Sequence, residues 1–192
     1  IRDTARSRGL GDEYKRQQKL LNDQLEKLSI PAVKYEINPD RRLIELSDLF
    51  KNVTSFSLEI GFGGGEHLVY QAERNPNIGF IGCEPYINGV AMLAGKLSKL
   101  ELTNVRIHPG DVRDLFDVLP DDSIDNVFLL YPDPWPKKRH HRRRFVTSEY
   151  LIDLQRVMKT GALLRLATDI PDYVRQSLQA VSYTHLTLPT IR

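Results

Sequence analysis

The hydrophobic and polar positions of this chain alternate between two patterns from residue 55 onward. Short, nearly continuous apolar runs, such as Val127–Leu130, are typical of buried strands. They predict strands at residues 55–60, 77–83, 104–108, 123–130 and 162–167. Between them, apolar residues recur with the period of a helix that has one buried face. The predicted helices cover residues 66 to about 75, 87–101, 112–119, 147–158 and 170–180.

Strands that alternate with helices indicate an α/β fold, in which helices cover both faces of a parallel sheet. We expect this sheet to occupy residues 55–181, after an N-terminal segment (1–54) with an arm and a helix at 12–28. Ligands in such sheets bind beyond the carboxyl ends of the strands. The residues that follow each strand are therefore the first candidates for a functional site.

A glycine turn follows the first strand, in the sequence Glu59-Ile-Gly61-Phe-Gly63-Gly-Gly-Glu66. Glycines let the backbone turn tightly and approach a ligand closely, although such a turn alone is also compatible with a purely structural role. Glu66 at the helix start disfavours a phosphate, because two negative charges would compete for one helix N-terminus. A ligand with a positive centre and no phosphate fits better, and S-adenosylmethionine has this chemistry.

Acidic residues follow the second and third strands. Glu84 comes about twenty residues after the glycines, where an acid can accept both ribose hydroxyls of a nucleoside. Asp111 is placed to meet an adenine amino group. Alone, Glu84 could be a surface acid and Asp111 a helix N-cap. Together with Gly61 and Gly63, they predict a nucleoside-binding site.

A rigid loop, Tyr131-Pro-Asp133-Pro-Trp135-Pro, follows the fourth strand. Its prolines fix the backbone and remove hydrogen-bond donors, so the loop is not helical. Trp135 could stack on a nucleobase, and Asp133 could accept a hydrogen bond from an exocyclic amine. The alternative is a stiff connector with a packed tryptophan.

A basic segment comes directly after this loop. Six of its eight residues are Lys or Arg: Lys137, Lys138, Arg139, Arg142, Arg143 and Arg144. The net charge of the whole chain is only +2, so the positive charge is concentrated here. Beside a nucleoside site, such a segment offers phosphate contacts and attracts a polyanion. A solvated charge run or a nuclear localisation signal is the alternative.

Composition narrows the possible classes of protein. A single cysteine, Cys83, excludes an internal disulfide and suits the reducing cytoplasm. No apolar run approaches the ~20 residues of a membrane helix. His140 and His141 are adjacent and have no cysteine near them, so we expect no metal site. Asp169, after the fifth strand, is either a residue of the site or a helix N-cap.

Four segments together resemble the bacterial tRNA (guanine-N7)-methyltransferases: Leu58–Glu66, Ile81–Pro85, Tyr131–Arg144 and Leu166–Asp169. The resemblance covers about residues 12–181, and the segment after the fourth strand is the most specific part. It implies a Rossmann-like fold and methyl transfer from S-adenosylmethionine to N7 of a guanine in the tRNA variable loop. We also expect the N-terminal segment (1–54) to contact tRNA. Whether such a protein is a monomer or a homodimer stays open.

The resemblance further implies roles for single residues. Asp133 matches the residue treated as catalytic in the family, and Lys137 and Asp169 match positions that contact tRNA. The positions that match cofactor-binding residues of the family are Glu59, Glu84, Asp111 and Asp133.

The chain departs from the family after about residue 181, where nothing matches the final antiparallel hairpin with its Thr-x-Phe-Glu-like segment. We expect a gene truncated near Val181, a missing hairpin, and a non-native tail at residues 182–192. A non-catalytic RNA- or cofactor-binding fragment is therefore an alternative. Another Rossmann-like methyltransferase is a second alternative, which the basic segment disfavours. Glu66 and the lack of a hydride-transfer site disfavour a nicotinamide dehydrogenase.

Overall fold

The computed structural model of the protein describes residues 19, 22 and 44–183. The helix expected at residues 12–28 and the tail from residue 184 onward lie outside this range, apart from the two isolated positions. Within the described residues, no helix is long and apolar enough to cross a membrane.

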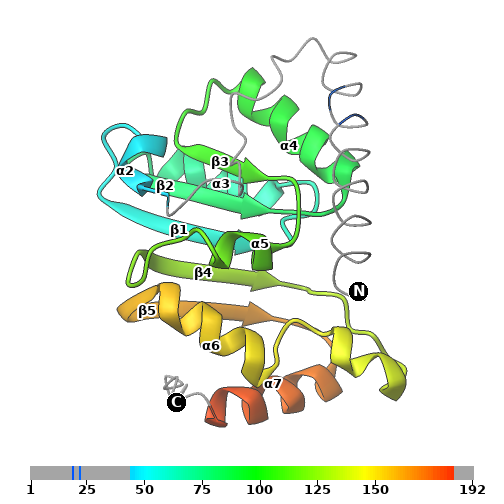
Figure 1. The fold of residues 1–192 in the computed structure, drawn as a ribbon. Helices are drawn as coiled ribbons and strands as arrows, with labels where there is room; N and C mark the ends of the chain where they lie inside the picture. Colours follow the sequence, from blue (N-terminus) through cyan, green and yellow to red (C-terminus); the bar gives the residue numbers. More distant parts are fainter. Residues whose placement is uncertain (1–18, 20–21, 23–43, 184–192) are drawn as a thin grey trace, which may run out of the picture.

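Five parallel strands form a single sheet in the order β3-β2-β1-β4-β5 (Figure 1). The predicted α/β class and all five predicted strands are confirmed. Within the described residues no strand pair is antiparallel. The strands are β1 (Ser55–Ile60), β2 (Ile78–Cys83), β3 (Val105–His108), β4 (Ile124–Leu130) and β5 (Met158–Ala167).

The strand order places a crevice at the centre of the sheet. β1 pairs with β2 on one side and with β4 on the other, so that Ile60 lies beside both Cys83 and Leu129. The chain proceeds outward from β1 through β2 to β3, then returns across the sheet to β4. In open α/β sheets this reversal opens a ligand-binding crevice at the carboxyl ends of the strands.

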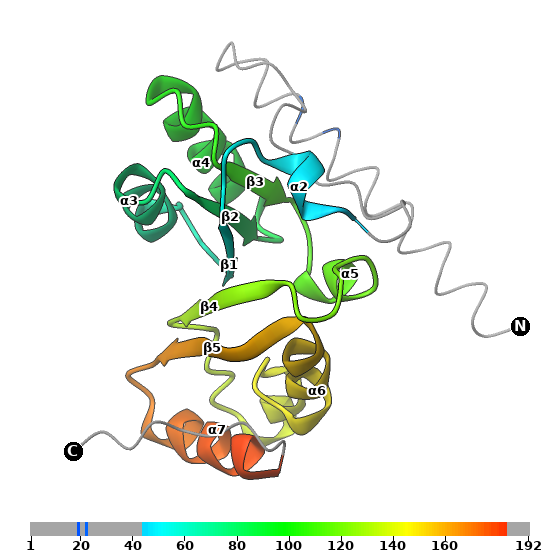
Figure 2. The same cartoon turned by 90° about the vertical axis from the view of Figure 1, so that its left-hand side faces the viewer.

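Helices cover both faces of the sheet, because apolar side chains point to each side of a parallel strand. Figure 2 shows α3 and α4 on one side and α2, α5 and α6 on the other, and α7 packs against α6. Each side has its own cluster of buried apolar residues. The helices are α2 (Leu46–Leu49), α3 (Glu66–Arg74), α4 (Ile87–Lys99), α5 (Val112–Phe116), α6 (Ser148–Val157) and α7 (Pro171–Tyr183).

We expected the packed domain to start at residue 55, but it begins earlier in the chain. Leu46 and Phe50 are buried in the same apolar cluster as α5 and α6. The main-chain N of Ile44 donates to the carbonyl of Val118 at 2.8 Å. Residues 44–54 therefore pack against the domain through Leu46 and Phe50, and are not a separate N-terminal segment. Similarly, α7 continues to Tyr183, two residues beyond the expected end of the domain.

Two local differences from the predicted elements lie near the end of the chain. β5 begins at Met158, earlier than predicted, and its pairing with β4 shifts register between Ile124 and Asn126. Gly161, within β5, has a φ of +84°, a left-handed backbone conformation that glycine favours. This glycine interrupts the apolar pattern of the strand. The basic segment forms a short 3-10 helix, η1 (Lys138–Arg143). This helix was not predicted, because the segment has no apolar periodicity.

Candidate active site

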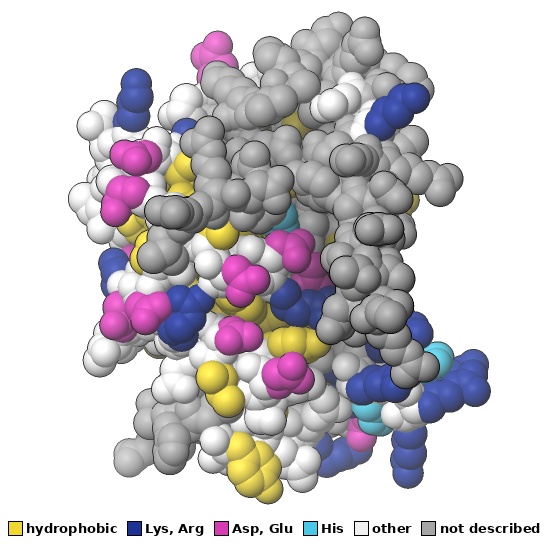
Figure 3. Space-filling model, in the orientation of Figure 1, with side chains coloured by type: hydrophobic (Ala, Val, Ile, Leu, Met, Phe, Trp, Pro, Cys, Tyr) yellow, Lys and Arg dark blue, Asp and Glu magenta, His cyan; other side chains and the backbone are white. Residues whose placement is uncertain are grey.

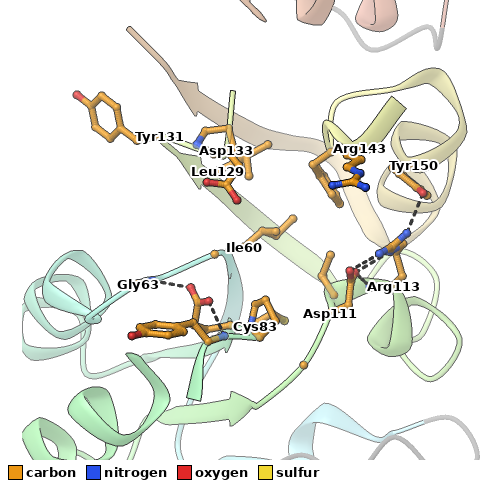
Figure 4. Close-up of a pocket in the computed structure, with 18 of the residues that line it drawn as sticks. Ile60, Gly63, Cys83, Asp111, Arg113, Leu129, Tyr131, Asp133, Arg143 and Tyr150 are labelled. Atoms are coloured by element: carbon orange, nitrogen blue, oxygen red, sulfur yellow. Dashed lines mark hydrogen bonds and ion pairs between the residues drawn. The ribbon is translucent and has the colours of Figure 1, made fainter. Parts of the chain in front are cut away.

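A cavity of about 990 Å³ lies at the carboxyl ends of β1, β2, β3 and β4. Figure 4 shows Gly63 and Cys83 on one side of it, and Asp133 and Arg143 on the other. Among the predicted site residues, the cavity is lined by Gly61, Gly63, Glu84, Asp111, Asp133, Arg142 and Arg143.

The glycine turn reaches the cavity through backbone conformations that glycine favours. Gly61, Gly63 and Gly65 have φ of +70°, +56° and +78°. A Cβ atom on Gly89, in α4, would lie 2.2 Å from the carbonyl oxygen of Gly63. The absence of a side chain at Gly89 therefore lets α4 pack directly against the turn.

Glu84, at the end of β2, fixes the glycine turn. One carboxylate oxygen accepts the main-chain N–H of Gly63 at 2.8 Å, and the other accepts that of Tyr86 at 2.8 Å. The residue is 8% exposed. A carboxylate offers about four acceptor positions, so Glu84 retains acceptor capacity toward the cavity that it lines.

Glu66, which the sequence offered as an argument against a phosphate ligand, is not among the residues that line the cavity. Its carboxylate pairs with the ammonium of Lys96 at 2.5 Å, and the side chain is largely exposed. Hydrogen bonding to Lys96 lowers the pKa of Glu66. Lys96 also donates to the carbonyl of Gly64 at 2.7 Å. Lys96 balances the negative charge of Glu66. Glu66 therefore repels a phosphate less strongly than its position in the sequence implied.

Asp111 lies at the start of α5 and is both the helix N-cap and a wall of the cavity. Its side chain accepts the main-chain N–H of Arg113 at 3.0 Å. The Arg113 guanidinium also pairs with it, and donates to the hydroxyl of Tyr150 at 2.9 Å. Burial raises the pKa of Asp111, but the hydrogen bonds and charge of Arg113 outweigh burial and leave the pKa below its ordinary value. Asp111 is therefore ionised near neutral pH.

The rigid loop after β4 places Asp133 and Trp135 at the cavity, as predicted from its prolines. Tyr131 and Trp135 have φ of +51° and +42°, unusual for residues with a side chain. The guanidinium of Arg143 lies 4.9 Å from the centre of a Trp135 ring, and the His140 ring meets Trp135 edge-on at 5.9 Å. η1 therefore packs back on the loop and supports it.

The basic segment divides into exposed and buried residues. Lys137, Lys138, Arg139, Arg142 and Arg143 are exposed. Figure 3 shows Lys and Arg side chains gathered at the end of the molecule where this segment lies, at the lower right.

Arg144 differs from the expectation that it would belong to an exposed basic surface, because its side chain is 1% exposed. It donates to the carbonyl of Pro134 at 2.7 Å and to Gln176 at 2.8 Å, and pairs with Asp172 at 3.0 Å. Arg144 therefore holds the proline-rich loop against α7.

Among the predicted acidic residues, Glu59 and Asp169 lie outside the residues that line the cavity. Glu59 is 3% exposed and bonds to Nδ1 of His67 at 2.7 Å. Burial raises the pKa of Glu59, and the His67 hydrogen bond offsets this only in part. Asp169 is exposed, and the N–H of Ile170 donates to Thr168 Oγ1 at 3.3 Å. The helix N-cap considered for Asp169 was expected before a helix starting at Ile170, whereas α7 starts at Pro171 and the side chain of Thr168 accepts the N–H of Ile170.

Sequence reasoning missed Arg113, Phe145 and Tyr150, which line the cavity beside Asp111. The Phe145 and Tyr150 rings stack with centroids 5.8 Å apart. Only Arg113 carried a signal, because it follows the acid by two residues. Tyr150 is 37 residues away from Arg113 in sequence, and only the packing of α5 against α6 brings them together.

Comparison with known proteins identifies the family. Residues 54–188 match the family model described as "Putative methyltransferase". The tRNA (guanine-N(7)-)-methyltransferase of Ruegeria pomeroyi is 62% identical over 86% of this chain and 69% of its own length. That of Roseobacter denitrificans is 61% identical over 86% of this chain and 70% of its own length.

A solved structure supports the fold alone. The chain in "Structure of an Antibiotic Related Methyltransferase" superposes with a TM-score of 0.61 at 18% identity, over 81% of this chain and 78% of that one. This agrees with the predicted Rossmann-like architecture. The extent and identity of the sequence matches show that the chain belongs to the tRNA (guanine-N(7)-)-methyltransferase family.

Proposed function

We propose that this chain transfers a methyl group from S-adenosylmethionine to N7 of a guanine in the variable loop of tRNA. One observation carries the proposal. A single cavity joins the acids that suit a nucleoside, Glu84 and Asp111, to the Asp133–Trp135 loop and the basic segment. The relatives described above are named as methyltransferases of guanine N7 in tRNA.

The cofactor suits the end of the cavity formed by β1, β2 and β3. Glu84 retains acceptor positions for ribose hydroxyls, and Asp111 is an ionised acceptor for an amino group. The backbone of Gly61 and Gly63 can approach a ligand closely, since no Cβ intervenes. S-adenosylmethionine supplies, when bound, an electrophilic methyl group on a positively charged sulfur.

The target guanine suits the opposite end, at Asp133 and Trp135. Guanine N7 has a free lone pair and no proton, so methylation forms an N7–C bond as the C–S bond breaks, without a base. Asp133 then acts as an orienting acceptor for a guanine N–H, and its charge offsets the positive charge that develops on the ring. Holding both reactants in line supplies most of the catalysis, as proximity can contribute ~7–11 kcal/mol.

The exposed basic residues serve the polyanionic substrate. Arg142 and Arg143 line the cavity, and Lys137, Lys138 and Arg139 continue outward from it. Such a surface contacts phosphates and draws tRNA toward the site. A tRNA substrate and the free, buried thiol of Cys83 agree with a cytoplasmic location.

The proposal is tested by incubating the chain with unmodified tRNA and methyl-labelled S-adenosylmethionine, then digesting the tRNA for nucleoside mass analysis. We expect labelled 7-methylguanosine, absent when a tRNA with adenosine in place of the variable-loop guanine is used. Cofactor binding without any methylated nucleoside would contradict the activity and favour a binding fragment. A label on another nucleoside would contradict the substrate.

A further inference from the structure

Arg113 joins two parts of the cavity wall that lie far apart in sequence. Its Nε donates to Asp111 Oδ1 at 2.8 Å, Nη2 pairs with Oδ2, and Nη1 donates to the Tyr150 hydroxyl at 2.9 Å. Asp111 and Arg113 belong to the start of α5, and Tyr150 to the first turn of α6. Figure 4 shows these three side chains in a continuous chain of contacts along one side of the cavity.

We infer that Arg113 and Tyr150 are positioning residues, which orient the Asp111 carboxylate to accept one hydrogen bond from the adenine amino group of the cofactor. The inference rests on the proposed function and adds two residues that select for adenine.

The hydrogen bonds of Asp111 leave room for a single further donor. Oδ1 accepts both the main-chain N–H and Nε–H of Arg113, at 3.0 and 2.8 Å, and Oδ2 accepts Nη2–H. A carboxylate has about four acceptor positions, so these contacts leave about one, on Oδ2. An amino group can donate there. A carbonyl oxygen at the same place on the ring cannot, and its lone pairs would repel the carboxylate.

Tyr150 restrains the guanidinium that makes these contacts. An Arg side chain has many rotamers, and a second hydrogen bond reduces their number. Tyr150 is itself held, because its ring stacks on Phe145 at 5.8 Å and its main-chain N–H donates to Thr147 Oγ1 at 3.4 Å. The position of Asp111 therefore depends on the start of α6 as well as on α5.

The charge of Arg113, like its hydrogen bonds, favours the binding of an amino group by Asp111. The guanidinium keeps Asp111 ionised, and an ionised acceptor forms the stronger hydrogen bond to an amine. A lysine at position 113 would supply the charge but not the planar pair of donors, so it would orient the carboxylate less well.

Calorimetric binding of two product analogues to the full chain tests the inference. S-adenosylhomocysteine carries the 6-amino group, and S-inosylhomocysteine carries a 6-oxo group instead. We expect the wild type to prefer the adenine compound, and Arg113→Gln to weaken its binding about tenfold, the value of one charge-assisted hydrogen bond. The preference of this variant for the adenine compound over the oxo compound should fall by the same factor, because its affinity for the oxo compound should change little. Tyr150→Phe, which keeps the ring, should show a smaller loss, and Arg113→Lys should restore the preference only in part.

Arg175→Gln is the matched control, since Arg175 is an exposed arginine that bonds Asp172 on α7 at 3.4 Å. It should leave both affinities unchanged. An undiminished preference in a folded Arg113→Gln protein would overturn the inference, even if the wild type methylates tRNA. If that variant does not fold, Tyr150→Phe decides in the same way. A wild type that binds neither compound would overturn the proposed function and this inference together.

Discussion

Asp133 is the residue on which the chemistry of the proposed reaction depends most. Asparagine has the same size but places a donor where the carboxylate has an acceptor, and it carries no charge. We expect Asp133→Asn to lower kcat about 100-fold, a loss similar to that of one preorganised polar contact to developing charge. The affinity for S-adenosylhomocysteine should fall much less. Single-turnover kinetics with tRNA and calorimetry measure the two effects. Turnover close to that of the wild type would contradict the assignment.

Glu59 is expected to reduce the stability of the folded domain near neutral pH. Burial raises its pKa above the ordinary 4.5, so the folded state binds more protons than the unfolded state and loses stability as pH rises through the raised pKa. Glu59→Gln removes this loss and can still accept a hydrogen bond from His67. The variant should be more stable than the wild type at neutral pH, and the difference should shrink as pH falls toward the ordinary pKa.

Urea unfolding at a series of pH values measures this difference, and Glu149→Gln, on the exposed side of α6, is the control. A variant that is less stable than the wild type at neutral pH would show that the pairing with His67 outweighs burial. The same variant tests the cofactor role that the family resemblance implied for Glu59. If the role is indirect, affinity for S-adenosylhomocysteine should change little.

At the scale of elements, the site depends on how closely α4 packs against the glycine turn. A Cβ on Gly89 would lie 2.2 Å from a backbone oxygen, which cannot move aside as a flexible side chain does. We expect Gly89→Ala to push α4 away from the turn and to cost about 1–3 kcal/mol of unfolding free energy, as overpacking does. Cofactor affinity should fall as well, because the turn carries Gly63 and its bond to Glu84.

Thermal unfolding and calorimetry with S-adenosylhomocysteine check both effects. Ser98→Ala, at an exposed position of the same helix, should leave affinity unchanged. If Gly89→Ala binds the ligand as tightly as the wild type, then the close packing of α4 does not shape the cofactor end of the cavity.

For the whole molecule, the distribution of charge matters more than the net charge of +2. Arg142 lines the cavity and the exposed Lys138 and Arg139 continue outward from it, so changing all three to Gln should weaken tRNA binding and flatten its salt dependence. Each lost phosphate contact reduces the magnitude of the slope of log K against log salt by about one. The slope of the triple variant should therefore be smaller in magnitude by up to about three.

Filter binding at several salt concentrations measures the slope. The matched control changes three exposed basic residues outside the basic segment, Lys51, Lys99 and Arg175, and removes the same charge. If both triple variants flatten the slope equally, then net charge and not the basic segment attracts tRNA.

The sequence-based predictions were accurate where a feature depends on residues close together in the chain, and they failed where it depends on residues far apart. Strand positions were predicted well, because a buried parallel strand needs a run of apolar residues that is visible in any short window. The placement of Glu84 and Asp111 followed from the parallel direction of the strands. Arg144 was assigned incorrectly to the exposed surface, since its partners Asp172 and Gln176 come from α7. Nothing within a few residues of Arg144 distinguishes it from its exposed neighbours.

The class of fold, the strand ends that form the site, and the family could all be read from the amino-acid sequence, because they depend on local patterns and contiguous motifs. The folded structure was needed to show which arginines are exposed, that Leu46 and Phe50 join the core, and that Arg113 links Tyr150 to Asp111. These outcomes depend on contacts between segments that are far apart along the chain. Such contacts form only when helices settle on the sheet, and they leave no periodic trace in the sequence.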